Sequence, residues 1–156
     1  MIDNTRVTYF SPYDDTQDAF LNFIKTAQKK IRLADYSFNL EPLVQLLVQK
    51  LGAGVDVQLV LDRSQSTGQT EQPVIDQLKQ AKVPMVIGTS SLRQIMHNKF
   101  TIIDDEWVQS GSWNYTAAAS KEDNFFDVEH SPDRAQQFTA YWQKMWDWIS
   151  QNEPQQ

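Results

Sequence analysis

Short apolar segments alternate along this chain with segments whose apolar residues recur at helical spacing, and this alternation restricts the fold more than any other feature. Residues 55–61 are almost continuously apolar, as strands covered on both faces of a parallel sheet tend to be. Residues 41–51 and 73–82 repeat their apolar side chains with the period of helices that cover such a sheet. The alternation predicts an α/β fold, with a mixed, largely parallel β-sheet sandwiched between helices.

The last third of the chain predicts a hairpin and a long helix. Residues 97–103 and 107–110 are strand-like and flank Asp104-Asp105-Glu106, a pattern typical of a β-hairpin. Aromatic residues at helical spacing near the C-terminus predict a terminal helix that packs on the core. A chain of 156 residues can bury one substantial core. We therefore expect a single domain over residues 1–150 and a polar tail over residues 151–156.

Composition excludes several classes of site. The chain contains no cysteine, which excludes thiol nucleophiles, disulfides and cysteine metal sites. The sequence has no cluster of metal ligands, so we expect neither a metal nor a cofactor. No apolar run approaches the ~20 residues that cross a bilayer, and we expect no stable membrane association. No signal peptide is visible, which predicts either a cytoplasmic protein or an exported one whose leader was removed before residue 1.

Two elements of the predicted hairpin region carry chemistry. His97 and Lys99 are two residues apart, so on a strand their side chains project from the same face. A nucleophile or proton carrier beside a fixed positive charge is suited to attack on a phosphate ester. The second element, Gly111-Ser112-Trp113-Asn114, offers a flexible backbone and neutral hydrogen-bond donors. Alone, the first would indicate a structural histidine and the second a turn; together they predict a phosphate site.

This pattern resembles the HKD motif of the phospholipase D superfamily. The matching residues are His97, Lys99, Asp104, Gly111, Ser112 and Asn114. Residues 31–38 and 54–62 are similar to the second and third strands of that family, and the resemblance covers roughly residues 5 to 150. Within the superfamily the chain looks most like the short endonucleases with a single HKD motif, of the Nuc and Zucchini types. The resemblance implies a phospholipase D/nuclease-like fold and a metal-independent phosphodiesterase.

The resemblance also implies a role for each residue of the motif. His97 is the expected nucleophile, which forms a phosphohistidine that water then hydrolyses. Lys99 is the expected electrostatic clamp on the phosphate oxygens, and Ser112 and Asn114 are further phosphate-binding donors. Gly111 is expected to let the backbone approach the phosphate closely. Trp113 either stacks on a base or packs against the sheet, and the sequence leaves both readings open.

The acidic residues of the motif region are predicted to have different roles. Asp104 follows His97 by an odd number of residues, so its side chain is expected on the opposite face and in a structural role. The family usually has an acidic residue, often Glu, directly before a downstream Asn, and the matching residue here is Asp123. By resemblance its carboxylate holds the catalytic imidazole in one tautomer. Because Asp is one methylene shorter than Glu, Glu122 is the alternative acid.

One motif implies two chains. The reaction needs a nucleophile and an acid for the leaving alkoxide, and one HKD motif supplies a single histidine. We therefore expect a homodimer that brings two copies of His97 to one phosphate. The expected substrate is single-stranded nucleic acid, and the wider expectation includes duplex nucleic acid. The net charge of −6 is unusual for an enzyme that acts on nucleic acid. The alternatives are a phospholipid hydrolase of the same chemistry, such as a cardiolipin hydrolase, or a non-catalytic nucleic-acid-binding domain.

Overall fold

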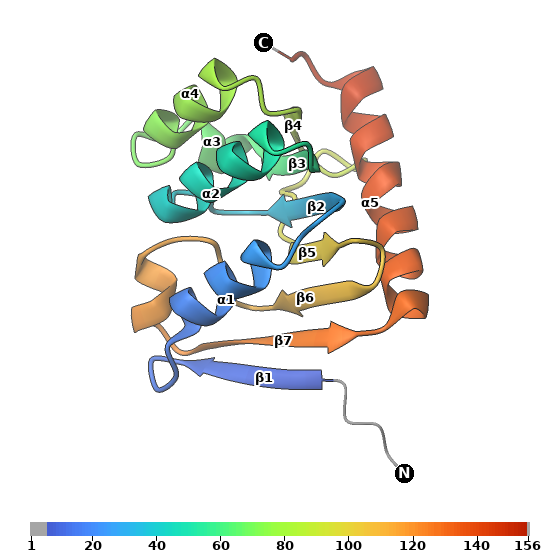
Figure 1. The fold of residues 1–156 in the computed structure, drawn as a ribbon. Coiled ribbons are helices and arrows are strands. Elements are labelled where there is room, and N and C mark those ends of the chain that lie inside the picture. The colour runs from blue at the N-terminus through green and yellow to red at the C-terminus, as the bar shows by residue number, and fades with distance from the viewer. Residues whose placement is uncertain (1–5, 156) are drawn as a thin grey trace.

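Seven strands form one mixed β-sheet in a computed structural model of the protein (Figure 1). The structure describes residues 6–155. The strands lie side by side in the order β1-β7-β6-β5-β2-β3-β4. Their bounds are β1 Arg6–Ser11, β2 Lys30–Asp35, β3 Asp56–Asp62, β4 Met85–Gly88, β5 Lys99–Ile103, β6 Trp107–Gly111 and β7 Asn124–His130.

The two halves of the sheet are built differently. β2, β3 and β4 are parallel neighbours, and a helical connection links each to the next. The other four neighbouring pairs, from β1 through to β2, are antiparallel. The predicted mixed sheet is confirmed, but parallel pairing between neighbours is the minority and not the rule. The tight turn at Asp104 and Asp105 reverses the chain after β5, whereas parallel neighbours need a long crossover.

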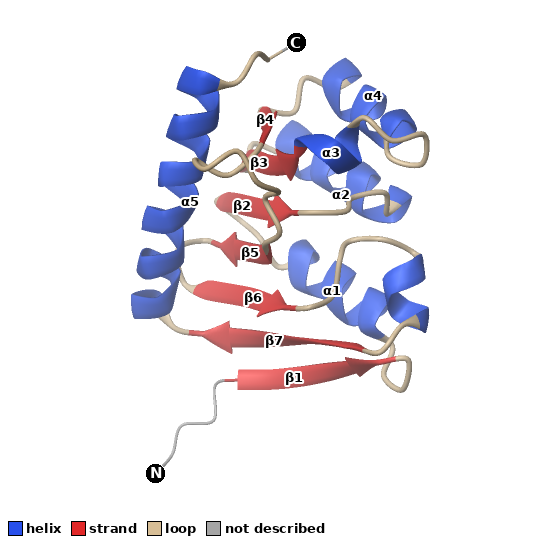
Figure 2. Cartoon of the chain, turned by 180° about the vertical axis from the view of Figure 1, so that it is seen from behind, coloured by secondary structure: helices blue, strands red, loops and turns tan. Residues whose placement is uncertain are grey.

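Helices cover both faces of this sheet, as the sequence predicts. α1, α2 and α4 lie on one face, and α5 runs across the other face (Figures 1 and 2). The bounds are α1 Thr16–Lys25, α2 Glu41–Gly52, α3 Arg63–Ser66, α4 Gln72–Gln80, α5 Pro132–Asn152 and a short 3-10 helix at Ala118–Lys121. The local sequence explains several starts: the side chains of Asp15 and Ser131 cap α1 and α5, and Pro42 stands in the first turn of α2.

The sheet separates two apolar clusters. The larger cluster lies under α1, α2 and α4, and it includes Phe20 and Trp113, both fully buried. The smaller cluster lies under α5 and is centred on the buried Trp142. Trp113 therefore packs in the core against the ring of Phe20, with ring centroids 5.3 Å apart. Of the two readings that the sequence leaves open for Trp113, the structure supports packing and not stacking on a base.

Three boundaries differ from the sequence-based expectation. β5 begins at Lys99, so His97 precedes the strand instead of lying on it. The polar composition of residues 63–72 predicts a loop, but this segment contains the short helix α3, whose start is capped by the Asp62 side chain. α5 continues through Asn152, two residues into the predicted polar tail, and Glu153 then forms ion pairs. The helix extends because its last turns still bury Ile149, which a polar composition alone does not reveal.

One edge of the sheet collects the residues of interest. The carboxyl ends of β2 and β3 lie there, at Asp35 and Asp62, and Asp35 pairs in register with Lys99 at the start of β5. The carboxyl end of β6 at Gly111 and the start of β7 at Asn124 lie at the same edge. Since side chains at the carboxyl ends of strands commonly form the sites of α/β proteins, this edge is the candidate site.

Candidate active site

His97 and Lys99 contact each other directly. The Nζ atom of Lys99 lies 3.1 Å from Nδ1 and 3.2 Å from Nε2 of His97, and it donates a 2.7 Å hydrogen bond to the His97 carbonyl oxygen. Lys99 is only 8% exposed, and this burial lowers the pKa of its ammonium while the charge of Asp35 raises it. The predicted contact of His97 with the cation of Lys99 is therefore present, although His97 lies in the irregular segment before β5 and not on the strand.

The segment that carries His97 is fastened to the end of β3. The Asp62 Oδ1 atom accepts a 2.8 Å hydrogen bond from the backbone N–H of Met96, directly before His97. Its Oδ2 atom accepts hydrogen bonds from the Ser64 hydroxyl and from the backbone N–H of Gln65. Asp62 is completely buried, and its bond to Met96 lies in the buried interior. One carboxylate thus fixes both the loop before His97 and the start of α3.

An aromatic ring forms one wall beside the histidine. The Tyr36 ring lies 4.7 Å from the His97 ring, centroid to centroid, and the Lys99 ammonium lies 5.5 Å from the Tyr36 ring centroid. The hydroxyl of Tyr36 accepts a 3.1 Å hydrogen bond from the Gln65 side chain. Because Tyr36 is held at its far end, its ring restricts the positions available to the imidazole.

The second motif element forms the opposite part of the edge. The Asn114 side-chain oxygen accepts a 3.1 Å hydrogen bond from the backbone N–H of Ser37. The Ser112 hydroxyl donates to the Asn124 side chain and accepts from the backbone N–H of Phe125. The Cα atom of Gly111 packs against β7, and an added Cβ would lie 2.2 Å from the Phe125 carbonyl oxygen. The close approach at Gly111 is therefore to a neighbouring strand.

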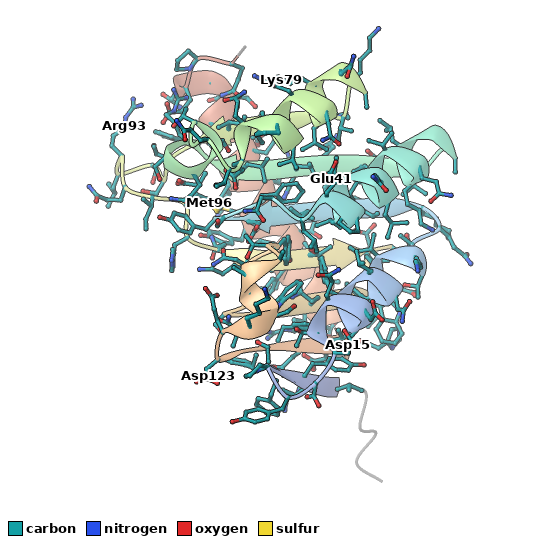
Figure 3. All side chains as sticks on the ribbon, turned by 90° about the vertical axis from the view of Figure 1, so that its left-hand side faces the viewer. Asp15, Glu41, Lys79, Arg93, Met96 and Asp123 are labelled. Atoms are coloured by element: carbon teal, nitrogen blue, oxygen red, sulfur yellow. The ribbon has the colours of Figure 1, made fainter. Side chains whose placement is uncertain are left out.

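Asp123 and Glu122 lie at the start of β7, at the same edge as His97. Figure 3 shows Arg93 and Met96 on the same side of the molecule as Asp123, with Asp123 separated from the other two. Within residues 6–155, no hydrogen bond joins His97 to Asp123 or to Glu122. The Glu122 carboxylate instead accepts a 3.2 Å hydrogen bond from the Asn124 side chain. The orienting role that the resemblance implies for Asp123 stays a prediction.

Asp104 lies at the far end of β5, away from His97. Its carboxylate accepts three backbone hydrogen bonds, from the N–H groups of Gln28, Lys29 and Lys30, over 2.8 to 3.0 Å. These bonds tie the hairpin turn to the segment that enters β2. The geometry agrees with the structural role that the sequence analysis assigns to Asp104.

Two further carboxylates are buried behind the site. Asp35 is fully buried, and burial raises its pKa well above the usual range. Glu71 is 3% exposed and accepts a hydrogen bond from the backbone N–H of Phe38. Burial is also the main reason that the pKa of Glu71 rises to about 7, although the bond from Phe38 opposes the rise. A buried acid with a raised pKa next to a lysine with a lowered pKa is typical of a functional site, and Asp35 and Lys99 form such a pair.

A groove of about 620 Å³ extends from His97 along α5. Its lining includes Asn98, Tyr141, Lys144 and Trp148. The side chain of Asn98 donates a 2.9 Å hydrogen bond to the Tyr141 hydroxyl, which holds the tyrosine at the rim of the groove. The groove combines exposed aromatic surface with one cation, a composition suited to a ligand that has both rings and negative charge.

Two arginines, Arg63 and Arg93, are partly neutralised by the same carboxylate. Nη2 of Arg63 lies 2.9 Å from the Glu153 carboxylate, and Nη1 of Arg93 lies 3.5 Å from it. The Thr89 hydroxyl donates a further 2.6 Å hydrogen bond to Glu153.

Within residues 6–155 no group of His, Cys, Asp and Glu side chains is arranged to hold a metal ion. Over the same residues, no helix is both long enough and apolar enough to cross a bilayer.

Three residues of this edge, Asp35, Tyr36 and Asp62, are not among those that the motif predicts. Asp35 and Asp62 each end a strand that is largely buried. A carboxylate at the carboxyl end of a buried strand is a recognisable signal in an α/β sequence. Tyr36 directly follows such a strand, but no sequence pattern indicates that its ring meets that of His97.

Known proteins with similar sequence or structure point to one family. A family model described as "Cardiolipin synthase, PLD-like domain" matches residues 20–146. The chain is 32% identical over 114 residues to a phospholipase D of Rickettsia bellii, which covers 73% of this chain and 55% of the relative. It is 25% identical over 129 residues to a mitochondrial cardiolipin hydrolase of Chlamydomonas reinhardtii, covering 82% and 56%. The chain thus spans about half the length of the curated relatives that it matches.

A solved structure matches nearly the whole fold. The phospholipase D family member Nuc from Salmonella typhimurium superimposes with a TM-score of 0.85 at 28% sequence identity. The match covers 91% of this chain and 93% of that one. The mixed seven-stranded sheet with helices on both faces is therefore shared with that structure along almost its full length.

Proposed function

Because this chain belongs to the phospholipase D superfamily, we propose that it is a metal-independent phosphodiesterase that hydrolyses nucleic-acid phosphodiester bonds through a phosphohistidine at His97. The observation that carries the proposal is the contact of the Lys99 ammonium with both ring nitrogens of His97. In this proposal the ammonium lies beside the non-bridging oxygens of the phosphate when the imidazole reaches phosphorus.

The reaction proceeds in two steps. A ring nitrogen of His97 attacks phosphorus, so a P–N bond forms while the P–O bond to the leaving nucleoside breaks. The leaving oxygen takes a proton from the partner's His97. Water then attacks phosphorus and loses a proton to the partner's His97, and the P–N bond breaks. Both histidines return to their starting forms, and the products are one alcohol and one phosphate monoester.

Phosphate binding in this proposal involves three residues of each chain. Lys99 supplies the charge, and its partial burial strengthens its interaction with an anion because little water screens it. Ser112 and Asn114 lie at the same edge of the sheet and supply neutral polar groups. Asp123, with Glu122 as the alternative, orients the imidazole in the assembled site.

A homodimer is part of the proposal because one chain supplies one histidine at this edge. His130, the other histidine of the chain, pairs with Trp107 at the opposite end of the sheet. It is therefore on the wrong edge to protonate a leaving group bound near His97. Two-fold symmetry would place two identical edges face to face and supply the missing acid.

The groove along α5 favours nucleic acid as the substrate. Tyr141 is 49% exposed at its rim, and Trp148 lines it together with Lys144. Aromatic faces stack on bases and a lysine neutralises an adjacent phosphate, so the groove suits a single strand. Because Glu153 already pairs with Arg63 and Arg93, we expect the affinity for nucleic acid to be modest.

A phospholipid substrate is the second candidate, and one observation favours it. Leu92 is 82% exposed and Ile95 is 49% exposed, and Ile95 lines the groove that contains His97. Exposed aliphatic side chains beside a phosphodiester site could contact lipid chains. The names of the Rickettsia and Chlamydomonas relatives also concern lipids.

The test is cleavage of plasmid and single-stranded DNA in excess EDTA, in parallel with release of phosphatidic acid from cardiolipin vesicles. His97→Ala is the inactive variant, and His130→Ala is the matched control because it removes the other histidine. We expect DNA cleavage by the wild type and by His130→Ala but not by His97→Ala. Cleavage restricted to lipid would favour the second candidate, and folded wild-type protein that cleaves neither substrate would contradict both.

A further inference from the structure

Asp35 lies directly behind the phosphate-binding lysine. It is the last residue of β2 and pairs in register with Lys99, the first residue of β5. Its side chain is fully buried, and Oδ2 accepts a 3.1 Å hydrogen bond from the backbone N–H of Tyr115. Tyr115 directly follows Asn114, so this hydrogen bond holds the asparagine turn. Because Asp35 and Lys99 are paired across neighbouring strands, their side chains lie next to each other on the same face of the sheet.

A buried carboxylate is costly unless its surroundings compensate it. The groups around Asp35 come from four segments: Lys99 on β5, the N–H and hydroxyl of Tyr115 after β6, Glu71 before α4 and the backbone of Tyr36. Burial raises the pKa of Asp35, and the second acid, Glu71, raises it further. The two N–H groups favour the charged carboxylate, and Lys99 is the only cation among these groups that does so.

Asp35 and Lys99 each favour the charged form of the other. Burial lowers the pKa of Lys99, and the charge of Asp35 is what opposes that effect. A neutral lysine cannot clamp a phosphate, so the function of Lys99 depends on a charge supplied from inside the protein. His97, which contacts the ammonium, offers ring nitrogens and a carbonyl oxygen but no negative charge.

We propose that Asp35 is a positioning residue, whose carboxylate keeps the Lys99 ammonium charged and fixes the turn that carries Asn114. Its effect on catalysis rests on the proposed phosphodiesterase function, whereas its effect on Lys99 does not. Asp35 touches neither substrate nor His97; it acts through the two phosphate-binding residues on either side of it.

The first test follows the Lys99 side chain itself by NMR, through the pH titration of its 13Cε resonance in the wild type and in Asp35→Asn. Asn keeps an oxygen for the Tyr115 N–H but removes the charge. We expect Lys99 to lose its proton at lower pH in Asp35→Asn than in the wild type. Glu71→Gln is the matched control, since it removes a buried acid that faces Asp35 but is not a partner of Lys99.

An unchanged Lys99 titration in Asp35→Asn would overturn the proposal, and so would an equal shift in Glu71→Gln. Asp35→Ser, which is also uncharged and smaller, repeats the test if Asp35→Asn does not fold. This measurement needs no turnover, so it is informative even if the wild type cleaves no nucleic acid.

The second test is the pH profile of cleavage. Because Asp35→Asn deprotonates Lys99 earlier, we expect kcat to fall about tenfold relative to the wild type at pH 9, and by less than about twofold at pH 6. A purely structural defect would lower kcat by the same factor at both pH values. A pH-independent loss would therefore contradict the charge role of Asp35.

Discussion

The Asp62 carboxylate accepts a 2.8 Å hydrogen bond from the backbone N–H of Met96, the residue directly before His97. The two groups come from segments 34 residues apart in sequence. The position of the candidate nucleophile is thus set by the end of β3, although His97 itself precedes β5. The position of His97 is therefore expected to depend on residues, such as Asp62, that take no part in the reaction.

We expect Asp62→Asn to weaken both folding and activity. The amide would face the N–H of Met96 or of Gln65 with its own N–H group, which leaves a buried donor without an acceptor and costs about 2–3 kcal/mol. Urea denaturation measures the stability, and DNA cleavage measures the activity. Asp56→Asn is the control, because Asp56 starts the same strand but is exposed, and an Asn side-chain oxygen still accepts the hydrogen bond from Arg32. Equal losses in the two variants would contradict this prediction.

Replacing Lys99 by Met should abolish most of the activity. Removal of one charged donor from a phosphate site typically costs about 10²–10³ in kcat. Asp35 then loses the charge that lowers its pKa, so its folded-state pKa rises further. A raised folded-state pKa of an acid means stability that is present at low pH and lost as pH rises. Denaturation should therefore show Lys99→Met more destabilised, relative to the wild type, at pH 8 than at pH 5.

Asp104→Asn tests the separation between structural and chemical residues of the motif. Its amide cannot accept all three N–H groups that the carboxylate binds, so we expect a loss of about 1–3 kcal/mol in the free energy of unfolding. Asp105→Asn is matched, because Asp105 also has a positive φ but only an exposed ion pair with Lys30. The folded Asp104→Asn protein should cleave substrate at close to the wild-type rate, and a selective loss of kcat would refute the structural assignment.

Gly111→Ala should be strongly destabilising. The new Cβ would lie 2.2 Å from the carbonyl oxygen of Phe125 and 2.7 Å from the Cα atom of Phe126, so β6 and β7 would have to separate. We expect a loss of at least about 2 kcal/mol. Gly52→Ala, where a Cβ has no atom within 4 Å, is the control and should be neutral or stabilising. Thermal melting of the two variants distinguishes them directly.

Glu71 predicts a specific pH dependence of stability. Its pKa is about 7 in the folded protein, against an ordinary value of 4.5. Because the folded-state pKa is raised, the contribution of Glu71 is fully present below pH 4.5 and is lost as pH rises through about 7. Glu71→Gln should match the wild type near pH 4.5 and exceed it by up to about 3 kcal/mol at pH 8. A constant difference between the two proteins across this range would disprove the assignment.

Much of the site was predictable because the motif residues are close in sequence. His97 and Lys99 are near neighbours in sequence, so their contact does not depend on distant segments. The motif therefore predicts the contact even though His97 lies outside the strand. The hairpin at Asp104 was predictable for the same reason. Asp35 and Asp62 were not predicted, because their partners Lys99 and Met96 lie on distant segments.

Most of the strands and helices and the residues of the HKD-like motif can be recognised in the amino-acid sequence, because periodicity and residue type are local properties of the chain. Which strands are neighbours, and that most neighbouring pairs are antiparallel, follows only from the folded protein. The same holds for the burial of Trp113 and for the ion pair of Glu153 with Arg63. Strand pairing, burial and the strength of buried charges depend on groups that come together only when the chain folds.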